Sequence, residues 1–201
     1  MKRVRRAVSA LVLLAAIGGL YTVGFGLGLV LLASLAVFLW INIHPLGKGA
    51  PTKRLHQLEC GSALLQLFLV TSTVNCVIFG ILWFRSIHFL MAEPARAEDI
   101  WIVVRANLGC TLIAVLAETI VFWNGMIRVY LSSVQLGLKH RVLAALCGWI
   151  PFVNIWYLAK IIRITSDEVE FETEKWELDA VRAESEVCKT KYPILMVHGV
   201  F

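Results

Sequence analysis

The sequence predicts an all-α integral membrane protein with about four transmembrane helices, and composition and charge both support this class. Hydrophobic residues make up 59% of the 201 residues, whereas an ordinary soluble domain contains roughly 45–50%. They form long uncharged runs, which a bilayer requires and a soluble core does not. Residues 167–186 contain nine acidic and two basic side chains, and the rest of the chain contains five acidic and 17 basic ones. The basic residues flank the apolar runs, so they indicate membrane topology and not nucleic-acid binding.

The first apolar run, residues 7–43, contains no charged residue. A single helix of this length would measure about 55 Å, and the hydrocarbon core of a bilayer measures about 30 Å. We therefore expect two short spans, at about 7–22 and 27–43, joined by a glycine-rich turn. The alternative is that Gly24 and Gly28 serve close helix packing, and the two roles are compatible.

Residues 1–20 have the basic start and apolar run of a secretory signal, but no convincing small-residue cleavage site follows. A retained membrane anchor is therefore the favoured interpretation. Two further spans are expected at about 60–84 and 104–125. The N-terminus, the segment after residue 43 and the segment after residue 125 are basic, whereas the connection between the third and fourth spans is balanced in charge. This pattern predicts a cytoplasmic N-terminus.

Residues 142–162 form a further apolar segment, interrupted by Pro151 and Asn154. Its length favours a fifth crossing, whereas its basic flanks favour a re-entrant segment with both ends on the same side. We favour re-entry slightly, and we assign residues 1–165 to one multispan membrane domain.

Glu118 is the one carboxylate well inside a predicted span. An ionisable residue at such depth is costly and suggests a proton or ion site. No second intramembrane acid or internal repeat accompanies it, as a transporter would lead one to expect. We therefore favour a structural role, with Glu118 protonated or hydrogen-bonded to Gln66, Asn75 or the hydroxyl cluster at 71–73.

Residues 166–189 are predicted to form an acidic helical linker. Ser166 is a suitable N-cap, and Asp167 and Glu168 would occupy the first turn, where the helix dipole favours acids. A narrow apolar stripe follows, made of Val169, Trp176, Ala180, Ala183 and Val187. The stripe is compatible with a short coiled-coil seam or with packing on a following domain, but a solvated stalk that acts as a spacer is the favoured interpretation.

Residues 190–201 have a different pattern from the acidic linker before them. An apolar run at 194–197 follows Pro193 and precedes His198 and Gly199. Such a run is typical of a buried β-strand, in which proline is tolerated only at the start. The order Tyr-Pro, aliphatic residues, His-Gly resembles the opening strand and oxyanion loop of bacterial triacylglycerol lipases, which belong to the α/β-hydrolase family. The segment from about residue 123 to 191 is also similar, more loosely, to the membrane and linker region of bacterial hydrolases of this type.

The resemblance implies that His198 and Gly199 form the His-Gly pair and that the backbone N–H of Val200 helps to bind the oxyanion. It further implies a serine hydrolase of the bacterial plasma membrane that acts on lipid or acyl-ester substrates without a cofactor. The sequence contains no G-x-S-x-G motif, and nothing after Phe201 supplies the acid and histidine of a triad. We therefore expect this chain to be the catalytically incompetent, truncated front of a longer hydrolase.

Two other functions remain open. The chain is alternatively a stand-alone multispan scaffold whose acidic stalk binds a partner, or a small transporter that uses Glu118. The five cysteines show no metal-binding or disulfide spacing, so no metal or cofactor is expected. The lipid bilayer is the one partner that all three functions have in common.

Overall fold

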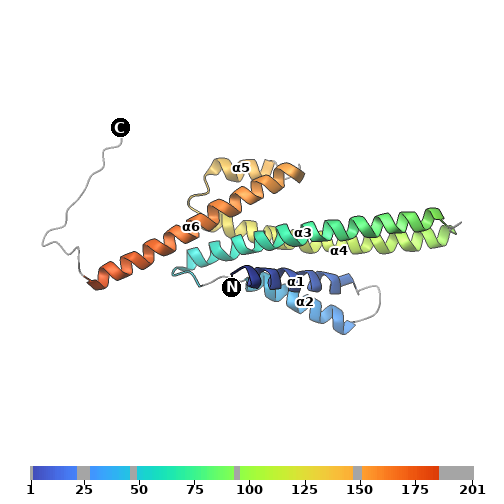
Figure 1. The fold of residues 1–201 in the computed structure, drawn as a ribbon, viewed down its shortest axis with the longest axis horizontal. Helices are drawn as coiled ribbons and strands as arrows, with labels where there is room; N and C mark the ends of the chain where they lie inside the picture. Colours follow the sequence, from blue (N-terminus) through green and yellow to red (C-terminus); the bar gives the residue numbers. More distant parts are fainter. Residues whose placement is uncertain (1, 22–27, 46–48, 93–95, 147–150, 186–201) are drawn as a thin grey trace.

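The computed structural model describes every residue except 1, 22–27, 46–48, 93–95, 147–150 and 186–201. The described residues are predominantly helical and include no β-strand. The helices are α1 (Lys2–Leu20), α2 (Gly28–Ile43), α3 (Lys53–Ala92), α4 (Ala97–Ser132), α5 (Leu138–Leu146) and α6 (Pro151–Ser185). Figure 1 shows α3 and α4 as a long antiparallel pair, with α1 and α2 along one side and α5 and α6 on the other.

Helices α3 and α4 pack closely where Gly61 of α3 meets Gly125 of α4. A Cβ atom on Gly61 would lie 2.9 Å from Cβ of Arg128 and 3.0 Å from the carbonyl oxygen of Gly125. A Cβ atom on Gly125 would lie 2.9 Å from a methyl carbon of Leu65. Small residues at this crossing therefore allow the two backbones to approach each other, as in packed membrane helices.

Polar contacts join the same two helices farther along. Asn107 donates a 2.7 Å hydrogen bond to the hydroxyl of Ser86, and the Trp83 indole N–H donates at 3.3 Å to the hydroxyl of Thr111. Glu118 lies between these contacts and the glycine crossing. Side-chain hydrogen bonds between helices favour association where the surroundings are apolar.

Two clusters of buried side chains hold the remaining helices. The first joins α1 and α2 to the middle of α3 and α4 through Leu13, Ile17, Phe38, Leu64, Phe79 and Val121, among others. The second joins α6 to the N-terminal part of α3 and the C-terminal part of α4 through Leu58, Leu65, Met126, Val129, Leu158 and Ile161, together with Leu136. The bundle therefore has a separate packing site for α6.

The C-terminal end of α2 is also capped by α4. Arg128 donates to the carbonyl oxygens of Asn42 at 3.1 Å and Ile43 at 3.4 Å, and Asn124 donates to that of Asn42 at 2.7 Å. A cation at the carbonyl end of a helix is favourable because the helix dipole is negative there.

The prediction of four or five spans is wrong. Among the described helices, two are both long and apolar enough to cross a membrane, and these are α3 and α4. The 16 residues of α2 reach about 24 Å, which is less than a hydrocarbon core of about 30 Å. The other three helices do not qualify as spans either. Helix α1 begins inside the basic N-terminal segment, and α5 has only nine residues. Helix α6 has nine uncharged positions before Lys160.

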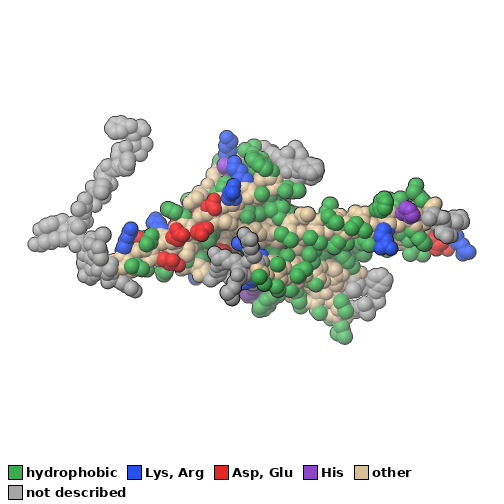
Figure 2. Space-filling model, viewed as in Figure 1, with side chains coloured by type: hydrophobic (Ala, Val, Ile, Leu, Met, Phe, Trp, Pro, Cys, Tyr) green, Lys and Arg blue, Asp and Glu red, His purple; other side chains and the backbone are tan. Residues whose placement is uncertain are grey.

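Most of the apolar surface of the two long helices is outside the core. In an apolar 18-residue stretch of each helix, the buried share of the stretch is 22% in α3 and 11% in α4. The core helix of a soluble domain would be mostly buried instead. Figure 2 shows the hydrophobic side chains along the visible flank of the bundle.

The predicted helix start at Ser166 is wrong. Helix α6 runs without a break from Pro151 to Ser185, so Ser166 lies in mid-helix and does not cap a new one. Its hydroxyl lies 3.1 Å from that of Ser62 on α3. Tertiary contacts thus continue a helix through residues that resemble a helix start. The terminal β-strand predicted at 190–201 lies outside the described residues.

Candidate functional site

The most highly connected polar group that the structure describes is the carboxylate of Glu168 on α6. Only 1% of its side-chain surface is exposed. Leu158, Ile161 and Thr165 are buried at helical spacings on the same face, and Glu168 is the next position on that stripe. Because its neighbours on the stripe pack against α3 and α4, the carboxylate is drawn into the interface between helices.

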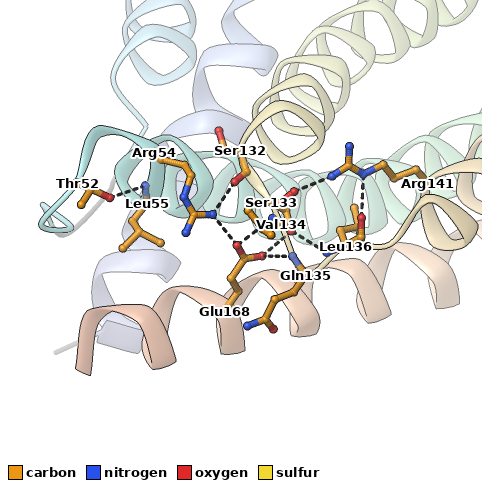
Figure 3. Close-up of polar contacts among 10 residues, drawn as sticks. All are labelled: Thr52, Arg54, Leu55, Ser132, Ser133, Val134, Gln135, Leu136, Arg141 and Glu168. Atoms are coloured by element: carbon orange, nitrogen blue, oxygen red, sulfur yellow. Dashed lines mark hydrogen bonds and ion pairs between the residues drawn. The ribbon is translucent and has the colours of Figure 1, made fainter. Parts of the chain in front are cut away.

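Four hydrogen bonds satisfy this carboxylate (Figure 3). Oε1 accepts from Arg54 Nη1 at 2.8 Å and from the backbone N–H of Val134 at 3.0 Å. Oε2 accepts from the hydroxyl of Ser133 at 2.5 Å and from the backbone N–H of Gln135 at 3.2 Å. We call this group of five residues, Arg54, Ser133, Val134, Gln135 and Glu168, the Glu168 latch.

The loop between α4 and α5 supplies three members of the latch and is itself held in place. The Ser133 hydroxyl also accepts from the N–H of Leu136 at 3.0 Å. Arg141 donates to the carbonyl oxygens of Leu136 at 2.9 Å and Ser133 at 2.6 Å, and Arg54 donates to that of Ser132 at 2.9 Å. Three helices and one loop therefore meet at a single buried charge.

The electrostatics of the latch follow from this geometry. Burial alone would raise the pKa of Glu168, because it disfavours the charged form. The hydrogen bonds from Ser133, Val134, Arg54 and Gln135 act in the opposite direction and prevail, so the pKa of Glu168 lies below its ordinary value. The carboxylate is thus ionised at neutral pH and acts as an anchor for its donors.

Such an arrangement suits a structural role better than catalysis. Each oxygen of Glu168 already accepts two hydrogen bonds, and a general base must instead accept a proton from a substrate. Within the described part of the chain, no group of three His, Cys, Asp or Glu side chains is placed to hold a metal ion. The latch fixes α6 relative to α3 and α4.

Glu118 is the second buried carboxyl group, with 6% of its surface exposed. Asn75 donates to its Oε1 at 2.9 Å, and Thr71 donates to its Oε2 at 3.0 Å. Of the partners expected from the sequence, these two lie beside Glu118, whereas Gln66 donates to Ser62 at 3.3 Å instead. Both donors are neutral and come from α3, so this group links the two long helices.

The other residues predicted for a functional site are His198, Gly199 and Val200. All three lie outside the described residues.

Sequence reasoning missed the latch. The sequence places Glu168 in the first turn of a solvated stalk and Arg54 in the basic segment after residue 43, and neither position predicts a contact between them. One signal was available in the sequence. Leu158, Ile161, Thr165 and Glu168 recur at helical spacing, so Glu168 lies on a helix face that begins with apolar residues. The partners could not have been found in this way, because Arg54 and Ser133 are 114 and 35 residues from Glu168 along the chain.

Known proteins offer no further guide, because no protein-family model, curated protein or solved structure matches this chain.

Proposed function

We propose that this chain is an integral membrane anchor that carries a lipase-like hydrolase segment on a rigid helical arm. The observation that carries the proposal is the continuity of α6, whose 35 residues pack on the bundle at one end and project beyond it at the other. The Glu168 latch lies at the point of departure. The 17 residues after Glu168 extend the helix by about 25 Å.

The anchoring part of the proposal is supported by α3 and α4. Both are long and apolar enough to cross a membrane, and their apolar surfaces are mostly exposed. Interhelical hydrogen bonds and the Gly61–Gly125 contact provide the packing that such helices need in lipid. With the N-terminus on the cytoplasmic side, the basic segments also lie on that side, in agreement with the positive-inside tendency.

The hydrolase part is supported by the likeness of residues 190–201 to the lipase oxyanion loop. In a longer product, a downstream serine would attack an acyl ester, and the backbone N–H of Val200 would help to stabilise the oxyanion. An arm fixed to the bilayer would keep such a domain close to lipid substrates of a bacterial plasma membrane.

Two measurements test the two parts separately. If the anchor assignment is correct, the full chain stays in the membrane fraction after extraction with alkaline carbonate. If the hydrolase assignment is correct, the reading frame continues past codon 201 into a G-x-S-x-G motif. The extended protein then reacts with a fluorophosphonate probe, and its Ser→Ala variant does not. Release by carbonate overturns the anchor, and a stop codon without such a motif in any nearby frame overturns the hydrolase.

A scaffold is the second candidate, and one observation favours it. The projecting arm exposes four large hydrophobic side chains to solvent: Phe171, Trp176, Leu178 and Val181. A partner bound there would bury them. A genuine stop codon after residue 201, together with protection of this arm from hydrogen exchange in native membranes but not in the purified protein, would favour the scaffold over the hydrolase anchor.

A further inference from the structure

The stretch from residue 119 to residue 166 contains no acidic residue and five Lys or Arg residues. Two of the five are used inside the fold, because Arg128 caps α2 and Arg141 holds the α4–α5 loop. The other three are Lys139 on α5 and Lys160 and Arg163 on α6. The side chains of Lys139 and Arg163 are exposed, and that of Lys160 is half-buried. No carboxylate within the described residues forms an ion pair with them.

Large hydrophobic side chains are exposed beside these cations. They are Leu138 and Val142 on α5 and Ile155 and Trp156 on α6. Lys160 Nζ lies 5.5 Å from the centroid of the Trp156 ring, and Tyr157 packs edge-on against the same ring. Trp, Tyr and Lys together are typical of the membrane–water interface, where one end of each side chain is apolar and the other polar. Figure 2 shows basic and hydrophobic side chains side by side over α5.

The opposite face of this part of α6 is already occupied. Leu158 and Ile161 are 2% and 1% exposed and pack in the second core cluster. The helix is therefore held against α3 and α4 by its inner face, and its outer face is directed away from the protein core. Helix α5 packs on α6, so the exposed residues of the two helices lie on neighbouring elements.

The order of charges along α6 matches the polarity of a leaflet. Residues 151–159 are uncharged, Lys160 and Arg163 follow, and acidic residues begin at Asp167. The change from basic to acidic takes about 10 Å of helix, which is close to the distance over which surface charge acts in salt. An anionic leaflet would attract the basic part and repel the acidic part. The latch buries Glu168, so the first exposed acids of the arm are Asp167 and Glu170.

From these observations we infer that α5 and the first part of α6 form a docking surface for anionic phospholipids of the leaflet that α3 and α4 enter. Lys139, Lys160 and Arg163 bind the phosphate-bearing headgroups, and the exposed hydrophobic residues contact the upper acyl chains. The charge reversal at Asp167 then directs the arm away from the membrane. This inference rests on the membrane insertion in the proposed function and adds the class of lipid and the place where it binds.

The test uses the full chain reconstituted in phosphatidylcholine vesicles with trace spin-labelled phosphatidylglycerol or spin-labelled phosphatidylcholine. Electron paramagnetic resonance gives the protein-restricted fraction of each lipid, and the ratio gives the lipid preference. One Lys or Arg contact near the surface corresponds to about a fivefold preference, so the unmodified chain should prefer phosphatidylglycerol by at least about fivefold. Lys139→Gln, Lys160→Gln and Arg163→Gln combined should bring the ratio to within about twofold of unity.

The matched control removes the same charge at the other end of the long pair, through Arg85→Gln, Arg96→Gln and Arg105→Gln combined. All three side chains are exposed, and Glu98 and Asp99 are part of the same end. This variant should keep most of the preference, and so should the charge-preserving variant Lys139→Arg, Lys160→Arg, Arg163→Lys. If the first triple variant does not fold, Lys139→Gln alone replaces it, because that side chain is exposed, and it must lower the ratio.

An unchanged ratio in the first triple variant, or an equal loss in the control, would overturn the inference. Flotation of each protein with pure phosphatidylcholine vesicles separates this result from the proposed function. A chain that floats but shows no lipid preference is anchored without the docking surface. A chain that does not float contradicts the anchor itself, and the inference falls with it.

Discussion

The hydroxyl of Ser133 and the carboxylate of Glu168 lie 2.5 Å apart and join the loop after α4 to the middle of α6. The same hydroxyl accepts from the N–H of Leu136, so Ser133 bridges the carboxylate and the turn that leads into α5. This contact therefore links the start of the loop to the position at which α6 crosses the bundle.

Removing the carboxylate should destabilise the fold more than any other single change in the latch. Glu168→Ala leaves the hydroxyl of Ser133 and the N–H groups of Val134 and Gln135 without their acceptor. The expected loss is about 3 kcal/mol in the free energy of unfolding, because buried polar groups would remain unsatisfied. Thermal or denaturant unfolding in detergent, followed by circular dichroism, measures it.

The matched variant is Arg54→Ala, which removes a partner whose side chain is 38% exposed. Solvent screens the partly exposed guanidinium, and the three other donors to the buried carboxylate remain, so the expected loss is only about 1 kcal/mol. A larger loss for Arg54→Ala than for Glu168→Ala would show that the backbone and hydroxyl donors are not the main partners of the carboxylate.

The latch should also make stability depend on acid. The pKa of Glu168 is lower in the folded protein than the ordinary value of 4.5, so the folded state binds the proton less readily than the unfolded state. Its contribution is fully present above the ordinary value and is lost as the pH falls through the folded-state pKa. The difference in unfolding free energy between wild type and Glu168→Gln should therefore shrink as the pH is lowered from about 7 to about 3. A difference that is constant or grows on acidification would contradict the ionised latch.

The glycine crossing should tolerate no added methyl group. Gly61→Ala would place Cβ against the Cβ of Arg128 and the backbone oxygen of Gly125, and neither can move without shifting α4. The expected cost is about 1–3 kcal/mol. A Cβ atom added to Gly80, on the same helix, would have no other atom within 4 Å, so Gly80→Ala should be neutral or stabilising by up to about 1 kcal/mol. Equal effects at both sites would argue against close packing at the crossing.

Glu118 should act as a helix–helix contact and not as a transport site. Glu118→Gln keeps an acceptor for Asn75 and should cost less than about 1 kcal/mol, whereas Glu118→Leu removes both contacts and should cost about 1–2 kcal/mol. Unfolding measurements give these values. Reconstituted wild-type vesicles should show no proton or cation flux above that of empty vesicles. Flux that disappears in a well-folded Glu118→Gln variant would support the transport hypothesis instead.

Capping of α2 by α4 gives a further test. Arg128→Ala should cost about 1 kcal/mol, because the carbonyl oxygens of Asn42 and Ile43 lose a charged donor. Arg128→Lys keeps the charge and should recover part of the loss. Hydrogen exchange should become faster in the last turn of α2 and stay unchanged in α6. Faster exchange in both helices would mean that Arg128 supports the bundle more broadly.

The pattern of residues alone determined that this chain is rich in helices with long apolar surfaces. The charge-free stretches of α3 and α4 and the acidic composition after Asp167 are properties of neighbouring residues, so they can be read without knowledge of the fold. The number of spans could not be read in the same way. An apolar run such as 27–43 fits a short membrane helix and a helix packed on its neighbours equally well. Whether the helix is long enough to cross a membrane can be judged only when its first and last residues are known.

Tertiary structure alone decided where the polar residues act. The position of Ser166 within a continuous helix depends on contacts with α3, which override the local signal for a helix start. The burial of Glu168 depends on Arg54 and on the loop at Ser133, which are distant in sequence. A local sequence pattern reflects only interactions between residues that are close along the chain. A buried charge is stabilised by hydrogen-bond donors that are distant in sequence and that the fold brings to it.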